Sequence, residues 1–283
     1  MLIGLSTPAV MQLPGVSSPW ESEAAVEDLV RVAVAADEAG LDFLTCAEHV
    51  AIPVTEAAGR GLTYWDPLST LAFLAAHTTR IRLATAVLVL GYHHPLEIAK
   101  RYGTLDRLSG GRLVLGVGVG SLAAEFGLLG APFDGRGERA DDAIAALRES
   151  MSTTRPSYSG GFYNYSGLAV EPCAVQPRVP IWVGGRTARS LRRAVRLGDG
   201  WMPYGLSTAA LADMLGGLDL PAGFEVVLPT GRAIDPLGDA DDARDRLQRL
   251  RAAGATAVTC TVAADSADHY CRQLVALREL ADT

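Results

Sequence analysis

The sequence has few cysteines, almost no lysine and few aromatic residues. Its 283 residues include four cysteines, 6% aromatic residues and a single lysine, Lys100. The cysteines stand far apart, at Cys46, Cys173, Cys260 and Cys271, and no two form a C-x-x-C pair. This spacing argues against a disulfide scaffold and favours a cytoplasmic protein with reduced thiols.

The sequence also lacks long apolar runs and an excess of positive charge. No stretch of about 20 apolar residues is free of Arg, Asp, Glu or Gly, so no membrane span is expected. The N-terminal run 1–6 has no basic region, so we expect no signal peptide. The 25 basic and 32 acidic residues give a net charge of −7, which argues against nucleic acids and anionic membranes as partners. An anionic ligand would therefore be held locally, by helix N-termini or a few arginines.

The sequence does contain a regular alternation of short β-branched runs and longer helical segments. The predicted strands cover residues 2–6, 43–46, 81–90, 112–117, 180–183, 200–203, 224–228 and 257–262. The predicted helices cover residues 23–39, 67–77, 95–108, 134–151, 187–197, 208–215, 240–253 and 266–280. Eight strands, each followed by a helix, predict parallel β-α-β units in an α/β fold. A closed (β/α)₈ barrel fits this number and length, and a doubly wound open sheet is the alternative.

No linker, charge run or long repeat marks a second domain, so residues 1–283 are predicted to form one barrel domain. Two segments interrupt the alternation. Residues 51–64, after the second strand, are rich in Gly, Pro and Ala, and residues 156–179 alternate aromatic residues with glycine. The second pattern suggests an inserted hairpin. Long loops in compact domains are often functional, and loops that follow barrel strands lie over the active-site mouth.

The residues directly after each strand are the candidates for chemistry, because that rim carries the catalytic groups of such barrels. Glu48 and His49 follow the second strand. A histidine titrates near neutrality, so His49 is the best acid–base candidate, and a rim histidine that only forms hydrogen bonds is the alternative. His93 and His94 follow the third strand. They lack a third ligand at suitable spacing, so no metal is expected.

Glycines cluster at the end of the fourth strand, at Gly116, Gly118 and Gly120. They do not form the G-x-G-x-x-G dinucleotide fingerprint, since Ser121 and Ala123 stand where a third glycine would fall. Such glycines allow a flat ligand or a phosphate to approach the backbone closely. Tight packing at a corner of the barrel explains them equally well.

The run Gly184-Gly185-Arg186-Thr187 leads from the fifth strand directly into a helix. Exposed amides and the positive end of the helix dipole make such a start an anion site. A short turn with a capping threonine is the alternative. Three more basic residues follow in the helix: Arg189, Arg192 and Arg193.

Several of these runs together resemble the bacterial luciferase-like monooxygenase family. The runs are Leu-Ser-Gly-Gly-Arg-Leu-Val-Leu-Gly-Val-Gly at 108–118, Pro-Ile-Trp-Val-Gly-Gly at 180–185, Gly-Asp-Gly-Trp at 198–201, Ala-Gly-Leu-Asp-Phe at 39–43 with Glu48-His49, and the stretch from Asp66-Pro67 to residues 81–85. They follow one another in order over roughly residues 1–205. The likeness is strongest to the branch that uses the deazaflavin coenzyme F420 in place of FMN.

The resemblance implies a TIM barrel whose coenzyme ring lies across the C-terminal mouth, in a homodimer. Similar proteins have a non-proline cis peptide at the end of the third strand, and the matching bond here is Ala86–Val87. The positions matched to coenzyme contacts are Ala86, Val87, Gly118, Gly120, Ser121, Gly184, Gly185, Arg186 and Thr187. The last four are expected near the coenzyme phosphate.

The sequence departs from the family pattern at two positions. Some F420 enzymes have an aspartate before the strand-two histidine and a glutamate after the strand-four glycines. Glu48 and Ser121 occupy these positions here, and Glu125 lies one turn later. Only His49 therefore keeps its match as a catalytic residue, with Glu48 as its companion and Ser121 as a hydrogen-bond donor.

These features predict an F420-dependent oxidoreductase that moves a hydride to or from a small organic substrate, with His49 handling the proton. An FMN-dependent monooxygenase is the alternative, because the sequence separates the two poorly. A coenzyme-binding protein without catalysis and a phosphosugar enzyme on the same barrel are two further hypotheses. Aromatic residues that would line the pocket, or pack in the core or a lid, are Tyr64, Trp65, Tyr92, Phe162 and Tyr163.

Overall fold

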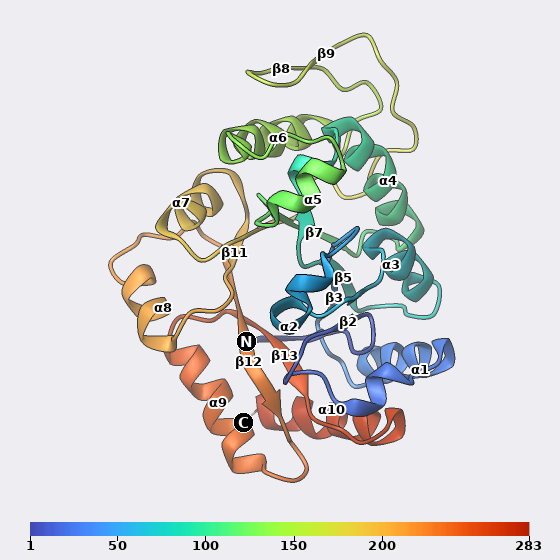
Figure 1. Cartoon of the computed structure of the whole chain (residues 1–283), viewed down its shortest axis with the longest axis vertical. Helices are drawn as coiled ribbons and strands as arrows, with labels where there is room; N and C mark the ends of the chain where they lie inside the picture. Colours follow the sequence, from blue (N-terminus) through green and yellow to red (C-terminus); the bar gives the residue numbers. More distant parts are fainter. Residues whose placement is uncertain (283) are drawn as a thin grey trace.

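The computed structural model describes residues 1–282, and its strands form one closed parallel barrel (Figure 1). The barrel strands, in order, are β1 (Leu2–Ser6), β3 (Phe43–Cys46), β5 (Arg82–Thr85), β7 (Leu113–Gly118), β10 (Ile181–Gly184), β11 (Gly200–Met202), β12 (Glu225–Ile234) and β13 (Ala257–Val262). Each strand pairs in parallel with the next, and β13 pairs with β1. The predicted (β/α)₈ barrel is confirmed, and the open sheet is excluded because the ring closes.

Eight helices within residues 1–282 surround the barrel: α1 (Val26–Glu38), α3 (Pro67–Ala75), α4 (Pro95–Leu108), α6 (Arg136–Ser150), α7 (Ala188–Leu197), α8 (Thr208–Leu215), α9 (Ala240–Ala252) and α10 (Ala267–Ala281). In α1 the buried Leu29, Val32, Ala33 and Ala36 follow the i, i+3, i+4, i+7 spacing that turns one face toward the strands. Among the described residues, no helix has both the length and the apolar character needed to cross a membrane.

Side-chain caps fix the points at which two of these helices begin. The Asp66 carboxylate accepts a hydrogen bond from the Ser69 amide at 2.7 Å, and Pro67 occupies the first helical position of α3. Thr187 Oγ1 accepts from the Ser190 amide at 3.2 Å at the start of α7. Both helix starts agree with the sequence prediction.

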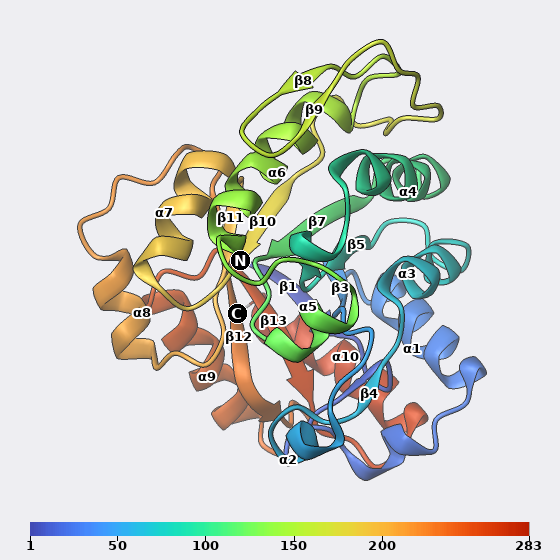
Figure 2. The same cartoon turned by 45° about the horizontal axis from the view of Figure 1, so that its top comes forward.

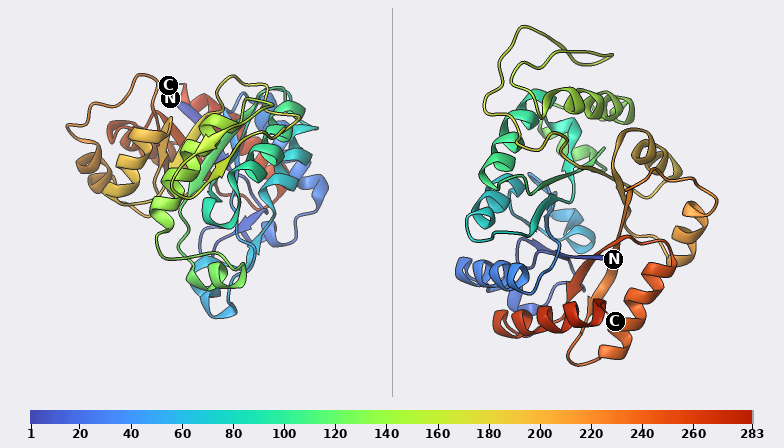
Figure 3. Two further views of the ribbon diagram at one scale, coloured as in Figure 1. Left: turned by 90° about the horizontal axis from the view of Figure 1, so that it is seen from above. Right: turned by 180° about the vertical axis from the view of Figure 1, so that it is seen from behind.

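The loops at the C-terminal ends of the strands carry additional short elements. β2 (Met11–Gln12) pairs with β4 (Thr63–Tyr64), and the other elements are η1 (Pro19–Ser22), η2 (Val54–Glu56), α2 (Ala57–Arg60) and α5 (Ala123–Leu128). Figure 1 shows α2 and α5 in front of the barrel. The left view of Figure 3 shows the corresponding blue and green segments at the end opposite the two termini. This end is the mouth of the barrel, where active sites of this fold lie.

A hairpin of β8 (Tyr158–Ser159) and β9 (Asn164–Tyr165) projects beyond α6 (Figure 2). The Asp142 carboxylate of α6 anchors it, accepting from the Tyr158 hydroxyl at 2.6 Å and the Phe162 amide at 2.7 Å. The ring of Tyr163 packs against His94 before α4, at 5.4 Å between ring centroids. Phe162 lies under the guanidinium of Arg139 in α6. Phe162 therefore contacts α6, and Tyr163 contacts the residue that caps α4.

Two predicted strands differ from the structure. The single strand predicted at 81–90 is broken: β5 ends at Thr85, the Ala86–Val87 peptide is cis, as the resemblance implies, and β6 (Leu88–Val89) and η3 (Leu90–Tyr92) follow. The apolar run continues through the break, so the pattern carries no signal of it. The strand predicted at 224–228 extends to Ile234, because an irregularity between Pro229 and Ala233 absorbs the turn-like residues and pairing with β13 resumes.

Two apolar clusters hold the barrel together. One lies between the strands and the outer helices. The second consists of Phe43, Ala84, Val114, Trp182, Val227 and Ala257, each fully buried. Gly4 of β1 makes room for this second cluster, because a Cβ there would overlap the ring of Phe43.

Arg112, the residue before β7, connects the C-terminal end of α3 to the barrel through hydrogen bonds, at the end opposite the mouth. Its guanidinium donates to the carbonyls of Ala75 at 2.9 Å, Thr78 at 3.0 Å and Ile81 at 3.0 Å. It also donates to its neighbour Ser109 O at 2.8 Å and to Thr78 Oγ1 at 2.8 Å. A single side chain thus satisfies carbonyls at the C-terminal end of α3 and in the turn that leads to β5.

Replacing Arg112 by lysine is expected to lower the free energy of unfolding by about 2–4 kcal/mol, because an ammonium lacks the planar fork and leaves carbonyls unpaired. Urea denaturation followed by circular dichroism measures the loss. The matched control is Arg155→Lys, which alters an exposed pair with Glu171 and should change stability by less than about 0.5 kcal/mol. An Arg112→Lys variant as stable as the wild type would contradict this role.

Candidate active site

The predicted site residues follow four consecutive strands of the barrel. Glu48 and His49 come after β3, Ala86 and Val87 after β5, Gly118–Ser121 at the end of β7, and Gly184–Thr187 at the end of β10. These strands are neighbours in the ring. Parallel strands end on one side, so the structure brings all of these residues to the same mouth.

A buried carboxylate, Glu125 of α5, connects three of the loops at the mouth. It is 1% exposed. One of its oxygens, Oε2, contacts His49 Nδ1 at 2.8 Å and accepts from the Tyr92 hydroxyl at 2.7 Å. The other, Oε1, accepts from the amides of Ala51, at 3.1 Å, and Val50.

These contacts determine which nitrogen of His49 carries a proton. The Glu125 carboxylate already accepts hydrogen bonds from three other groups and has no proton to donate. His49 Nδ1 is therefore the donor in their contact. In the neutral ring Nε2 then keeps its lone pair. Among residues 1–282 this nitrogen has no hydrogen-bond partner, and the side chain is 18% exposed beside the ring of Tyr64.

The electrostatics of this network keep Glu125 charged. Burial by itself would raise the pKa of the Glu125 carboxyl, but the hydrogen bonds from Tyr92, His49, Ala51 and Val50 outweigh it and lower the pKa. Burial and the neighbouring carboxylate raise the pKa of Tyr92 far above its ordinary value. At neutral pH, Glu125 is therefore a charged acceptor that orients the His49 ring.

Glu48 was predicted as the catalytic companion of His49, and in the structure it contacts a different histidine. Its Oε1 lies 2.7 Å from His93 Nε2, and its Oε2 accepts from the Val89 amide at 2.6 Å. Burial by itself would lower the pKa of His93, but the bond and charge of Glu48 raise it above the ordinary value. Both oxygens of Glu48 are thus engaged with the loop that follows β5.

The glycines at the mouth make room for protein side chains. A Cβ on Gly118 would lie 2.6 Å from Val87 Cγ2, and a Cβ on Gly184 would lie 2.8 Å from Val87 Cγ1. Gly120 has a φ of +76°, and its Cβ would meet the ring of Phe126. Tight packing at the corner of the barrel, one of the two interpretations of the strand-four glycines, describes Gly118 and Gly120, and Gly184 packs against Val87 in the same way.

The start of α7 has the capping threonine that the sequence suggests, and it also leaves polar groups exposed. Thr187 caps the helix, and its own amide donates to Ser190 Oγ at 3.1 Å. The amides of Ala188 and Arg189 lie in the first turn, where no helical carbonyl is available to accept them. The side chains of Arg186 and Arg189 are exposed and have no carboxylate partner within residues 1–282. The first turn therefore still offers amides and positive charge to an anion.

The remaining arginines of this region differ in their accessibility. Arg193 is buried and paired with Asp141, so it is not available to a ligand. Two arginines that the sequence interpretation missed contact the loop after β7: Arg60 Nη1 lies 3.4 Å from Ser121 Oγ, and Arg136 Nε donates to the Gly120 carbonyl at 3.1 Å. They come from α2 and α6, and their spacing in the sequence gives no sign of this meeting.

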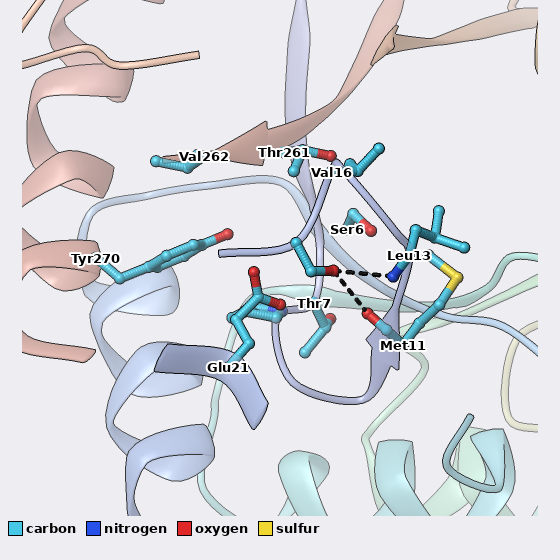
Figure 4. Close-up of a pocket in the computed structure, with 11 residues that line it drawn as sticks. Ser6, Thr7, Met11, Leu13, Val16, Glu21, Thr261, Val262 and Tyr270 are labelled. Carbon is cyan, nitrogen blue, oxygen red and sulfur yellow. Dashed lines mark hydrogen bonds between the residues drawn. The ribbon is translucent and has the colours of Figure 1, made fainter. Parts of the chain in front are cut away.

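A small cavity lies between the ends of β1 and β13 and is separate from this network (Figure 4). Its volume is about 30 Å³, and Thr7, Glu21 and Tyr270 are among the residues that line it. Such a volume holds a water molecule, whereas cofactor sites measure roughly 300–1,000 Å³. The cavity is therefore not a coenzyme site. Within residues 1–282 no three His, Cys, Asp or Glu side chains are grouped as metal ligands.

Comparison with known proteins identifies the family. The family model described as luciferase-like monooxygenase matches residues 3–220. The chain belongs to this family. The resemblance found in the sequence is thereby confirmed.

Among curated proteins, this luciferase-like chain is 34% identical over 188 residues to an uncharacterised protein of Mycobacterium tuberculosis. It is 30% identical over 216 residues to an F420-dependent glucose-6-phosphate dehydrogenase of Nocardia farcinica. The matches cover 62% and 74% of the chain. They span less than two thirds of the relatives' own length, 65% and 62% respectively.

Solved structures share the barrel over the whole chain. The monooxygenase RslO1 from Streptomyces bottropensis superimposes with a TM-score of 0.77 at 21% identity, covering 99% of this chain and 98% of that one. An F420-dependent secondary alcohol dehydrogenase, in complex with an F420-acetone adduct, gives a TM-score of 0.76 at 14% identity with the same coverage. At these identities the likeness shows the luciferase-like fold alone.

Replacing Glu125 by glutamine is expected to lower the free energy of unfolding at neutral pH by about 1–3 kcal/mol, because an NH₂ group would face buried N–H and O–H donors. The folded pKa of Glu125 lies below 4.5, so its stabilisation is present above that value and is lost as the pH falls through the folded pKa. The difference in the free energy of unfolding between the variant and the wild type should therefore become smaller below about pH 4.5.

Urea denaturation of both proteins at about pH 7 and about pH 3.5 measures this difference. The matched control is Glu138→Gln, which alters an exposed glutamate of α6 and should differ little from the wild type at either pH. An equal difference at the two pH values would contradict the assignment of Glu125 as a charged acceptor.

Proposed function

We propose that the chain is an F420-dependent oxidoreductase that moves a hydride to or from a small organic substrate. The observation that carries this proposal is His49, whose Nδ1 is held by the buried Glu125 carboxylate while its Nε2 remains unpaired at the mouth. Membership of the luciferase-like family and relatives named as F420-dependent glucose-6-phosphate dehydrogenases support the choice of coenzyme. When bound, the deazaflavin supplies a ring carbon that accepts or donates hydride.

The described residues fit such a coenzyme at both of its ends. Ala86 and Val87 are partly exposed between the buried Thr85 and Leu88, so they offer an apolar surface at the mouth against which a ring would lie. The first-turn amides of α7, with Arg186 and Arg189, which have no carboxylate partner within residues 1–282, would hold its phosphate. In this proposal Gly118, Gly120 and Gly184 act indirectly, by admitting Val87 and Phe126.

The protein would handle the proton that accompanies hydride transfer. For a substrate with an alcohol group, His49 Nε2 would take the hydroxyl proton as hydride leaves the neighbouring carbon. The ring would then carry a positive charge, which Glu125 would stabilise at Nδ1. Reduction of a carbonyl would reverse both transfers, with the protonated His49 as the donor. Buried Glu125 is well suited to this role, because charge pairs interact more strongly away from water.

An FMN-dependent monooxygenase is the second candidate function. The description of the family and the structural neighbour RslO1 favour it. The same mouth would serve this reaction, with His49 as a hydrogen-bonding or proton-transfer group beside the flavin. A protein that binds the coenzyme without turnover is the candidate from a different class.

Titration of the purified chain with oxidised F420 and, separately, with FMN distinguishes the coenzymes. We expect F420 to bind at least about tenfold more tightly than FMN, a difference of about 1.4 kcal/mol. His49→Ala should keep F420 affinity within about threefold and lower the rate of hydride transfer by about 10²–10⁴. His77→Ala, which alters an exposed histidine near the end of α3, is the matched control.

Three results would contradict parts of this proposal. Tight FMN binding without F420 binding would favour the monooxygenase. F420 binding without hydride transfer, under any supplied donor or acceptor, would favour the binding protein. An unchanged rate in His49→Ala would remove His49 from the reaction.

A further inference from the structure

Glu48 is a buried carboxylate at the mouth that the proposed reaction does not use. It is 8% exposed, and its two oxygens are bound by groups on a single neighbouring loop. One oxygen accepts from the Val89 amide of β6, and the other contacts Nε2 of His93, just before α4. Glu48 itself follows β3, so it links the loops after two adjacent strands at distances of 2.6 and 2.7 Å.

The segment that Glu48 holds is confined on its other side by glycines. Val87 lies two residues before Val89, and its two methyl groups fill the space above Gly118 and Gly184. β6 also pairs with β7 through Leu88 and Val89. The Val87 side chain is therefore held by packing against β7 and β10, and Glu48 holds the backbone at Val89.

We propose that Glu48 is a positioning residue that holds residues 86–89 at the mouth and, through them, the apolar surface for the coenzyme ring. The last step rests on the proposed function, whereas the link between Glu48 and the segment rests on the contacts alone. Ala86 and Val87 are the partly exposed members of this run. A shift of their backbone would change the surface that a flat ligand meets.

The chemistry of the two contacts explains why a carboxylate stands here. The Val89 amide donates, and His93 Nε2 donates when it carries a proton and accepts when it does not, so a carboxylate with two acceptor oxygens serves the amide and a protonated Nε2. The groups that face His93 are Glu48, Glu97 at 3.8 Å from Nδ1, and the more distant Arg101. Glutamine would accept from Val89 with its oxygen and donate to a neutral His93 with its NH₂ group. Alanine would remove the hydrogen-bond partner of both the Val89 amide and His93 Nε2.

Hydrogen exchange on the protein without coenzyme tests the link directly. Glu48→Ala should speed exchange of the Val89 amide by about tenfold or more, and Glu48→Gln should stay within about threefold of the wild type. Glu48→Asp, which shortens the side chain, serves if the alanine variant does not fold, and it should also speed exchange. The matched control is Asp37→Ala, which removes a buried acceptor of the Arg80 and Ile81 amides at the opposite end of the barrel.

The control should speed exchange at Arg80 and Ile81 and leave Val89 unchanged. Unchanged exchange at Val89 in both Glu48→Ala and Glu48→Asp would overturn the proposal. Faster exchange confined to Val89 and its neighbours would support it.

Affinity for oxidised F420 tests the second step. Glu48→Ala should weaken binding by about tenfold or more, while Glu48→Gln and Asp37→Ala should stay within about threefold. Fast exchange at Val89 with unchanged F420 affinity would overturn the claim that the segment supports the ring. If the wild type binds no F420, the proposed function fails, and the exchange experiment alone decides the role of Glu48.

Discussion

The hydrogen bonds that converge on the Glu125 carboxylate hold the mouth of this barrel together. Strand pairing brings β3, β5 and β7 side by side, but it leaves their loops free to point in many directions. Glu125 joins these loops, because His49, Val50 and Ala51 come from one loop and Tyr92 from another. Burial makes this arrangement obligatory, since a buried carboxylate without its donors is strongly destabilising. The orientation of His49, and the reaction proposed for it, depend on this charge.

Some residues in and beside the runs that resemble the family act at the other end of the barrel. Arg112 donates to carbonyls at the end of α3 and before β5, and Asp106, two residues before the run 108–118, accepts from the Leu113 amide at the start of β7. Asp199 accepts from the Ile181 amide at 2.8 Å at the start of β10 and pairs with Arg178. These side chains satisfy backbone groups at the end of the barrel opposite the mouth. Such contacts stabilise a fold that proteins with different reactions share. The loops at the mouth would then determine which substrate binds.

The sequence predicted most of the scaffold and only part of the site. Alternating strands and helices are local patterns, so all eight units and the cap residues Asp66 and Thr187 were predictable. The break after Thr85 was not, because Ala86 and Val87 continue an apolar run. The partners of Glu48 and Glu125 were also hidden, since Glu125 meets His49 across 76 residues of sequence and Glu48 meets His93 across 45. Adjacency in the sequence suggested a Glu48–His49 pair, whereas the fold pairs each of them elsewhere.

In the proposed reaction a fixed His49 faces a coenzyme bound at the mouth, and a crystal structure of the chain with oxidised F420 would show whether it does. We expect the ring to lie against Val87, the phosphate to lie at the first turn of α7, and His49 Nε2 to point to the space where substrate meets the ring. His49 Nδ1 should still donate to Glu125. A coenzyme bound away from these residues, or a His49 ring turned so that Nε2 contacts Glu125, would contradict it.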